Sequence, residues 1–115
     1  MKFNKTLNQI IKCIKDKKGE NIVVLDIREL SSLTDYFIIC TSDSDPKTKA
    51  ITSHIKKDLS KSKMKPIQIE GINHFDWVLM DYFDTVVHIF RKETREFYNI
   101  ERLWADAKVV KIKDD

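Results

Sequence analysis

The spacing of hydrophobic residues divides the chain into segments that predict helices and segments that predict strands. In the first segment the apolar residues recur every three or four positions, which places them on one face of a helix. A lysine-rich run and Gly19 follow, and both are typical of a helix C-terminus. The apolar face of this predicted helix consists of Phe3, Leu7, Ile10, Ile11 and Ile14.

Two mainly apolar runs, Ile22–Ile27 and Tyr36–Cys40, come next. Their side chains are apolar on both faces of an extended backbone, so they predict strands in the interior of a sheet that is covered on two sides. The polar residues 28–35 between them predict a turn region.

A second helix is predicted to start at Asp45, because Asp is a good N-cap and Pro46 suits the first helical position. A basic tract, Lys56 to Lys65, closes this helix, and residues 66–69 alternate in polarity like a short strand. The buried stripe of the helix is predicted to hold Ala50, Ile51, Ile55 and Leu59.

Two further apolar runs, Trp77–Tyr82 and Thr85–Phe90, are so close in sequence that they predict a β-hairpin. Tight hairpin turns favour Gly or Asn, and Phe83 tolerates a positive φ angle poorly. We therefore expect a turn slightly wider than two residues.

The last apolar residues recur at helical spacing and predict one more helix, followed by a charged tail. The order of elements predicts an α/β fold with a five-stranded mixed sheet flanked by helices. We expect one domain over residues 1–107 and a C-terminal tail over 108–115, whose Val109, Val110 and Ile112 could dock on the body. The spaced residues of the last helix are Phe97, Ile100, Leu103, Trp104 and Ala107.

Composition narrows the functional classes. The chain has 115 residues, of which 42% are hydrophobic and 34% charged, and its 21 basic and 18 acidic residues are interspersed. This balance favours a solvated surface over a nucleic-acid patch, so direct RNA contact stays open but is not indicated. Cys13 and Cys40 are expected to be free and buried. No secretory, transit or membrane-spanning pattern is present, which predicts a cytoplasmic protein with no membrane partner.

The sequence gives little support to catalysis or to a bound cofactor. The clearest helix start lacks the glycines of a phosphate-binding loop. Asp81 and Asp84 could hold magnesium with help from Asp26 or Asp76, but they lie three apart across a turn, and a turn-capping role is the favoured alternative for Asp84. The histidines, His54, His74 and His88, have no His or Cys neighbours at metal-ligand spacing. We expect no catalytic residue and no metal ligand.

Aromatic residues are concentrated in the last third of the chain, where they serve a core or a protein interface equally well. On the first hairpin strand, Trp77, Leu79 and Asp81 share one face, and Val78, Met80 and Tyr82 share the other. Whichever set the helices leave uncovered is a candidate docking surface. Core and interface stay equally open for Trp77, and the core is favoured for Trp104.

Five sequence strings occur in order with characteristic spacing, and together they resemble the ribosomal silencing factor (Iojap-like) family from about Ile22 to Ala107. The strings are Leu33–Phe37, Ile69–Gly71, Trp77–Tyr82 with Asp84, Val87–Phe90, and Phe97–Tyr98 followed by Glu101 and Leu103–Ala107.

The resemblance implies a non-enzymatic repressor of translation that binds the large-subunit ribosomal protein uL-fourteen (number fourteen in the universal nomenclature) and blocks joining of the small subunit. It also implies a fold similar to a nucleotidyltransferase domain without the catalytic signature, and a homodimer in isolation. A nucleotide-binding enzyme of that fold is the alternative. Relatives often have glycine at the position of Phe83. The residues that match the family's docking region are Trp77, Leu79, Asp81, Tyr82, Phe83, Asp84, His88, Phe90, Tyr98, Leu103 and Trp104.

Overall fold

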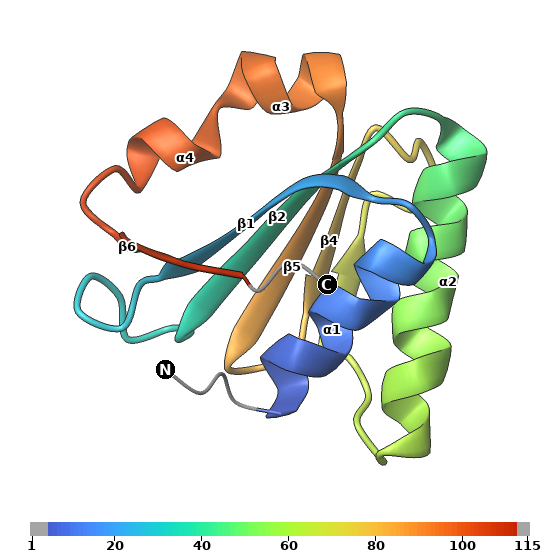
Figure 1. Ribbon diagram of the computed structural model, residues 1–115, viewed down its shortest axis with the longest axis horizontal. Helices are drawn as coiled ribbons and strands as arrows, with labels where there is room; N and C mark the ends of the chain where they lie inside the picture. The colour runs from blue at the N-terminus through green and yellow to red at the C-terminus, as the bar shows by residue number, and fades with distance from the viewer. Residues whose placement is uncertain (1–4, 113–115) are drawn as a thin grey trace.

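The fold is built on a six-stranded mixed sheet with strand order β3-β4-β5-β2-β1-β6, shown in Figure 1 as a computed structural model. The structure describes residues 5–112. The central strands β2 and β5 are parallel, and all other neighbours are antiparallel. The elements are α1 (Lys5–Asp16), β1 (Glu20–Asp26), β2 (Tyr36–Ser42), α2 (Asp45–Lys61), β3 (Gln68–Glu70), β4 (Trp77–Asp81), β5 (Thr85–Arg91), α3 (Lys92–Tyr98), α4 (Ile100–Leu103) and β6 (Lys108–Val110).

The α/β class and the mixed sheet are confirmed, but the predicted number of five strands is wrong. The sixth strand, β6, lies at the start of the segment predicted to be a tail and pairs antiparallel with β1. Val110 is buried there, opposite Val24. A three-residue strand that begins with Lys108 and is followed by Lys111 is too short for a polar-apolar alternation to stand out from its charged surroundings.

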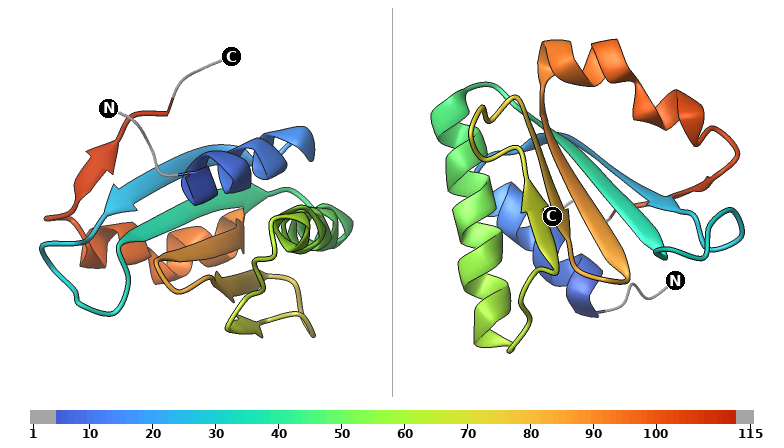
Figure 2. Two further views of the ribbon diagram at one scale, coloured as in Figure 1. Left: turned by 90° about the horizontal axis from the view of Figure 1, so that it is seen from below. Right: turned by 180° about the vertical axis from the view of Figure 1, so that it is seen from behind.

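Helices α1 and α2 pack together over one face of the sheet, and Figure 2 shows both on the same side. Leu7, Ile10 and Ile14 of α1 are fully buried, as predicted, whereas Phe3 lies outside the described residues. The buried stripe of α2 differs from the prediction in one place, because Ala50 is exposed. The buried residues of α2 are Thr48, Ile51, Thr52, Ile55 and Leu59.

The start of α2 is one residue earlier than predicted. Its N-cap is Ser44, with an extended backbone, and the Ser44 hydroxyl accepts a hydrogen bond from the Lys47 N–H at 3.1 Å. Asp45 therefore belongs to the first helical turn, where its negative charge interacts favourably with the positive end of the helix dipole and stabilises the helix. Ser and Asp are equally good N-caps, so the sequence alone does not separate them.

The single helix predicted over the last aromatic residues is wrong, because the chain forms two short helices, α3 and α4. The break is at Asn99, whose φ angle of 44° is left-handed and whose N–H donates to the Arg95 carbonyl at 2.8 Å. Asparagine tolerates this conformation better than most residues. Arg95 ties α3 to the sheet, since its guanidinium donates to the Asn21 carbonyl and the Thr41 hydroxyl, both at 2.8 Å.

Both cysteines are free and buried, as predicted. Cys13 lies in α1 and Cys40 in β2, and both belong to the core between the helices and the sheet. Burial raises the pKa of each thiol to about 12, which keeps both uncharged and unreactive near neutral pH.

Candidate functional site

The second face of the sheet is only partly covered. Strand β4 makes this clear, because Val78 and Met80 are fully buried in the core under α1 and α2, whereas Trp77, Leu79 and Asp81 on the opposite face are half-buried. The helices on that opposite face are the short α3 and α4, and none of the residues of α3 is buried. The uncovered set is therefore the one containing Trp77, and we call this side of the sheet the open face.

An aromatic cluster occupies the open face. The Trp77 ring stacks on the Phe90 ring and contacts the Tyr98 ring of α3, with distances between ring centroids of 4.8 and 4.9 Å. Phe37 of β2 packs edge-on against His88 at 4.8 Å and against the Trp104 ring at 5.2 Å. These contacts link three strands to α3 and to the segment after α4. We define the aromatic cluster as Phe37, Trp77, His88, Phe90, Tyr98 and Trp104.

The position of Trp77 is fixed by its backbone and by its indole. Gly71 in the preceding loop has a φ angle of 88°, and a Cβ there would overlap the Trp77 carbonyl, so only glycine lets the loop pass so closely. The Trp77 indole N–H donates to His88 Nδ1 at 3.2 Å. The indole is therefore held in one orientation while part of the ring faces solvent.

His88 lies on the open face, buried among the aromatic rings, and orients Trp77. It is only 4% exposed, and burial lowers the pKa of its imidazole to about 4, so the ring is neutral near pH 7. Since Nδ1 accepts the Trp77 N–H, the proton of the neutral ring lies on Nε2, which has no hydrogen-bond partner among the described residues. The structure thus gives His88 a positioning role toward Trp77.

The predicted docking residues separate into three groups by exposure. Tyr82, His88 and Phe90 are buried, and Tyr82 points with Val78 and Met80 into the core beneath α1 and α2. The half-buried residues are Trp77, Leu79, Asp81, Asp84 and Trp104, and the exposed ones are Phe83, Tyr98 and Leu103.

Sequence reasoning missed one exposed aromatic residue. Phe97 is one of the residues at helical spacing in the predicted last helix and is not among the predicted docking residues, yet it is 81% exposed and packs edge-on against Tyr98 at 5.0 Å. The signal that could have found it is Asn99, a residue suited to end a helix, directly after this aromatic pair.

The hairpin tip joins the open face at the end of β4. β4 ends at Asp81 and β5 begins at Thr85, so three residues connect them, yet the Tyr82 N–H still donates to the Thr85 carbonyl at 2.8 Å. The expected turn of more than two residues therefore holds for the strand bounds but not for the hydrogen bonds across the hairpin. The Asp84 N–H donates to the Tyr82 carbonyl at 2.9 Å, and Phe83 between them has a φ angle of 75°. This is a γ-turn, a strained conformation for a residue with a side chain. It presents the Phe83 ring to solvent.

The two aspartates of the hairpin have separate local roles. Asp81 Oδ1 accepts the Phe83 N–H at 2.9 Å, and Asp84 Oδ1 accepts the Thr85 hydroxyl at 3.2 Å. The Asp84 carbonyl also accepts the N–H groups of Asp35 and Tyr36. These contacts support the turn. Within residues 5–112, no group of three or more His, Cys, Asp and Glu residues is arranged to hold a metal ion.

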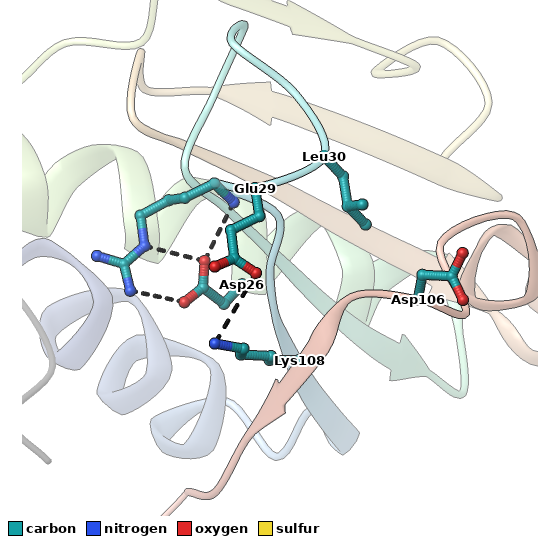
Figure 3. Close-up of a pocket in the computed structure, with 6 residues that line it drawn as sticks. Asp26, Glu29, Leu30, Asp106 and Lys108 are labelled. Carbon is teal, nitrogen blue, oxygen red and sulfur yellow. Dashed lines mark hydrogen bonds and ion pairs between the residues drawn. The ribbon is translucent and has the colours of Figure 1, made fainter.

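A small cavity of about 220 Å³ lies between the β1–β2 connection and the segment leading into β6 (Figure 3). Asp26 makes two hydrogen bonds with the Arg28 guanidinium, at 2.9 and 2.7 Å, and these hold the pKa of its carboxyl below the usual range. Lys108 lies 3.9 Å from Glu29. Asp26 is therefore engaged in an ion pair with Arg28 rather than in a group with Asp81 or Asp84.

On the open face of this small α/β domain, exposed and half-buried apolar side chains lie beside the carboxylates of Asp81 and Asp84. An arrangement of this kind is typical of protein-binding surfaces. The chain belongs to the ribosomal silencing factor family, because the model of the family described as "Ribosomal silencing factor during starvation" matches residues 1–115. This membership confirms the resemblance found in the sequence and indicates a regulatory role connected with the ribosome.

Individual relatives agree with this membership. A ribosomal silencing factor of Halalkalibacterium halodurans is 34% identical over 113 residues, covering 98% of this chain and 97% of that protein. A crystal structure of a protein from Chromobacterium violaceum superposes with a TM-score of 0.86 at 30% identity, over 100% of this chain and 92% of the other. A mouse protein named "Mitochondrial assembly of ribosomal large subunit protein 1" is 27% identical over 101 residues, covering 85% of this chain and 44% of that protein.

None of the helices in the described part of the chain has the length and apolar character needed to cross a membrane.

Proposed function

We propose that the protein represses translation by docking onto the large ribosomal subunit through its open face. In this proposal the contact is with ribosomal protein uL-fourteen, and the bound factor prevents the small subunit from joining. It acts in the cytoplasm, where the subunits meet, and needs no chemical step. Support comes from membership of the silencing factor family and from a relative whose name refers to assembly of the large ribosomal subunit.

The observation that carries this proposal is the asymmetry of β4. Its inner side chains are fully buried, whereas Trp77 and Leu79 on the open face stay half-buried although each is large and apolar. A half-buried tryptophan that is already held in one orientation loses little conformational entropy on binding. Residues of this kind, close to the centre of an apolar patch, contribute most of the binding energy at protein interfaces.

The acidic residues at the hairpin tip complement a basic partner. Asp81 and Asp84 lie beside Phe83 at the end of β4. Ribosomal proteins are in general basic because they contact RNA, so opposite charges at the edge of the interface would speed encounter and fix the orientation of the bound factor. Phe83 and Tyr98 would add apolar contact on either side of Leu79.

The experiment that tests the proposal is co-sedimentation with isolated large and small subunits, followed by a subunit-joining assay. We expect binding to the large subunit alone and reduced joining. Leu79→Arg should weaken binding at least about tenfold, because it places a cation in the middle of the apolar surface and facing a basic partner. The measurements are the fraction of protein that sediments with the large subunit and the yield of joined ribosomes.

A matched control uses the opposite edge of the sheet. Val109 of β6 is 69% exposed and, opposite Leu25, faces the same side of the sheet as Trp77, but four strands away from β4 and outside the aromatic cluster. Val109→Arg introduces the same charge there, so it should bind and inhibit joining like the unchanged protein. Circular dichroism would establish that both variants are folded. Equal binding of the unchanged protein and Leu79→Arg would contradict the assignment of the open face. Magnesium-dependent binding of nucleotides in calorimetry, with no binding to either subunit, would instead favour the nucleotidyltransferase-like alternative.

The proposal includes a homodimer in isolation. Each copy has one open face, and two such faces could cover one another when no ribosome is present, since apolar surfaces of this kind are usually occupied. Light scattering of the free protein and of Leu79→Arg would test this, with a shift of the variant toward monomer as the expected result. An unchanged mass would place the dimer contact elsewhere.

A further inference from the structure

A groove of about 780 Å³ lies between α2 and β3, at the opposite edge of the sheet from β6. Figure 2 shows α2 running alongside this edge. The groove is lined by aliphatic side chains, among them Met64, Ile67 and Ile69, and by lysines. Ile67 is 65% exposed. The groove opens on the side of α2, whereas the open face lies on the other side of the sheet, so a ligand could occupy each at the same time.

The strand that forms one wall of the groove has a free edge. β3 pairs with β4 and with no other strand in residues 5–112. Half of its backbone N–H and C=O groups therefore point away from the sheet without a partner strand. Such an edge is a template for the addition of another extended segment.

The charge of the groove is positive and uncompensated. Lys56, Lys57 and Lys65 line it, no Asp or Glu does, and none of the three lysines has an ion pair within the described part of the chain. Between Ser53 and Ile69, the first and last residues that line the groove, Asp58 is the one acidic residue. It faces α1 instead, where it accepts hydrogen bonds from Gln9 at 3.1 Å and from Cys13 at 3.5 Å.

We propose that this groove binds an extended, acidic segment of a partner protein, which adds to β3 as a further strand. Backbone hydrogen bonds to the β3 edge would supply affinity, apolar side chains at alternate positions would cover Ile67 and Ile69, and carboxylates would meet Lys56, Lys57 and Lys65. This goes beyond docking through the open face and does not depend on it.

Two other occupants fit the groove less well. A second copy of the chain, paired β3 to β3, would bring the two sets of lysines together without opposing charge. Single-stranded RNA is bound by aromatic and arginine side chains on which bases stack, and the groove has neither, while its aliphatic wall would stay uncovered. An extended acidic peptide can do three things at once: pair with the lysines, hydrogen-bond to the free edge of β3 and cover the aliphatic wall.

The test uses an array of heptapeptides in which Glu alternates with Val, Ile, Leu or Thr. We expect some members to bind and to shift the backbone amide NMR signals of residues 66–70. Lys56→Glu with Lys57→Glu should weaken this binding at least about tenfold, as should methylation of the peptide nitrogens that face β3. The matched control, Lys17→Glu with Lys49→Glu, makes the same change of charge at exposed lysines outside the groove and should alter binding less than about twofold.

The outcomes separate this proposal from the one on the open face. If no peptide binds at about 1 mM, or if methylated peptides bind equally well, strand addition is wrong. If a uridine oligonucleotide binds and the groove variant loses that binding while no peptide does, the ligand is RNA and the proposal is overturned. The groove variant should still sediment with the large subunit like the unchanged protein, whatever the peptides do.

Discussion

The two faces of the sheet are covered in different ways. One face lies under α1 and α2, of 12 and 17 residues, and its aliphatic side chains are fully buried. The other lies under α3 and α4, of 7 and 4 residues, and it carries aromatic side chains of which several remain in contact with solvent. The first face is the main source of stability, and the second has apolar area left over for a partner.

The residue types of the two faces overlap, since buried Leu25, Ile27 and Ile39 also lie on the open face, but the aromatic cluster is confined to that face. Isoleucine and leucine fill space between long helices without polar atoms to satisfy. Tryptophan, tyrosine and histidine combine apolar rings with a polar group, and on the open face the Trp77 indole N–H is satisfied by His88 Nδ1. The comparison indicates that two long helices exclude water from one face, whereas two short helices leave aromatic side chains accessible on the other.

The largest effect is expected from removing a buried leucine under α2. Leu59→Ala deletes a fully buried side chain and should lower the free energy of unfolding by about 2–5 kcal/mol, because it leaves a cavity. Leu103→Ala, the same change at an exposed residue of α4, should alter it by less than about 0.5 kcal/mol. Urea denaturation measures both. Equal losses would mean that the open face is as tightly packed as the other.

The next effect is a dependence of stability on pH through His88. Burial lowers the pKa of His88 in the folded protein to about 4, below the 6.5 of an unperturbed histidine. The unfolded chain therefore binds more protons between these values, so stability is full above pH 6.5 and decreases as pH falls toward 4. The loss should reach about 3 kcal/mol.

The matched variant for this effect is His88→Gln, whose amide oxygen can still accept the Trp77 N–H. Its free energy of unfolding should change less between pH 6.5 and 4 than that of the unchanged protein, and the difference between the two curves isolates the histidine. The intrinsic fluorescence of tryptophan during denaturant titrations follows both. Parallel curves would show that His88 is as accessible to protons when folded as when unfolded.

The smallest effect concerns the hairpin tip. Phe83→Gly removes the strain of a positive φ angle, which is about 1–2 kcal/mol, at an entropic cost of about 0.5–1 kcal/mol, so the protein should become slightly more stable. Phe83→Ala loses the same ring without relieving the backbone and should not gain stability. If Phe83 contributes to docking, both variants should bind the large subunit more weakly. A stability gain in both variants would exclude backbone strain as the cause.

Much of the fold follows from the sequence because the long elements repeat their signals. The sequence predicts the strands around Val24 and Ile38 and the buried stripe of α2, because each contains several apolar residues at the spacing of its secondary structure. The predictions fail where the structure depends on a single residue or on a very short segment. Asn99 interrupts a helical pattern that continues on both sides of it, and β6 is too short to form a pattern.

The sequence predicts the docking surface only as a choice between the two faces of β4. Alternation along β4 separates Trp77 and Leu79 from Val78 and Met80, but which set is covered depends on the lengths of helices far away in sequence. For the same reason Tyr82, His88 and Phe90 matched the docking region as sequence and are nevertheless buried. Burial is a property of the assembled layers, so periodicity identifies the faces of a strand and not their neighbours.

The central pairing of β2 with β5 has a consequence for how the chain folds during synthesis. These two strands are parallel neighbours, yet residues 43–84 separate them in sequence, and β1 receives its second neighbour only when residues 108–110 arrive. Contacts between such distant segments require closing long loops, which should make folding slower than in a helical domain of this size. β2, apolar on both faces, therefore leaves the ribosome well before its central partner exists.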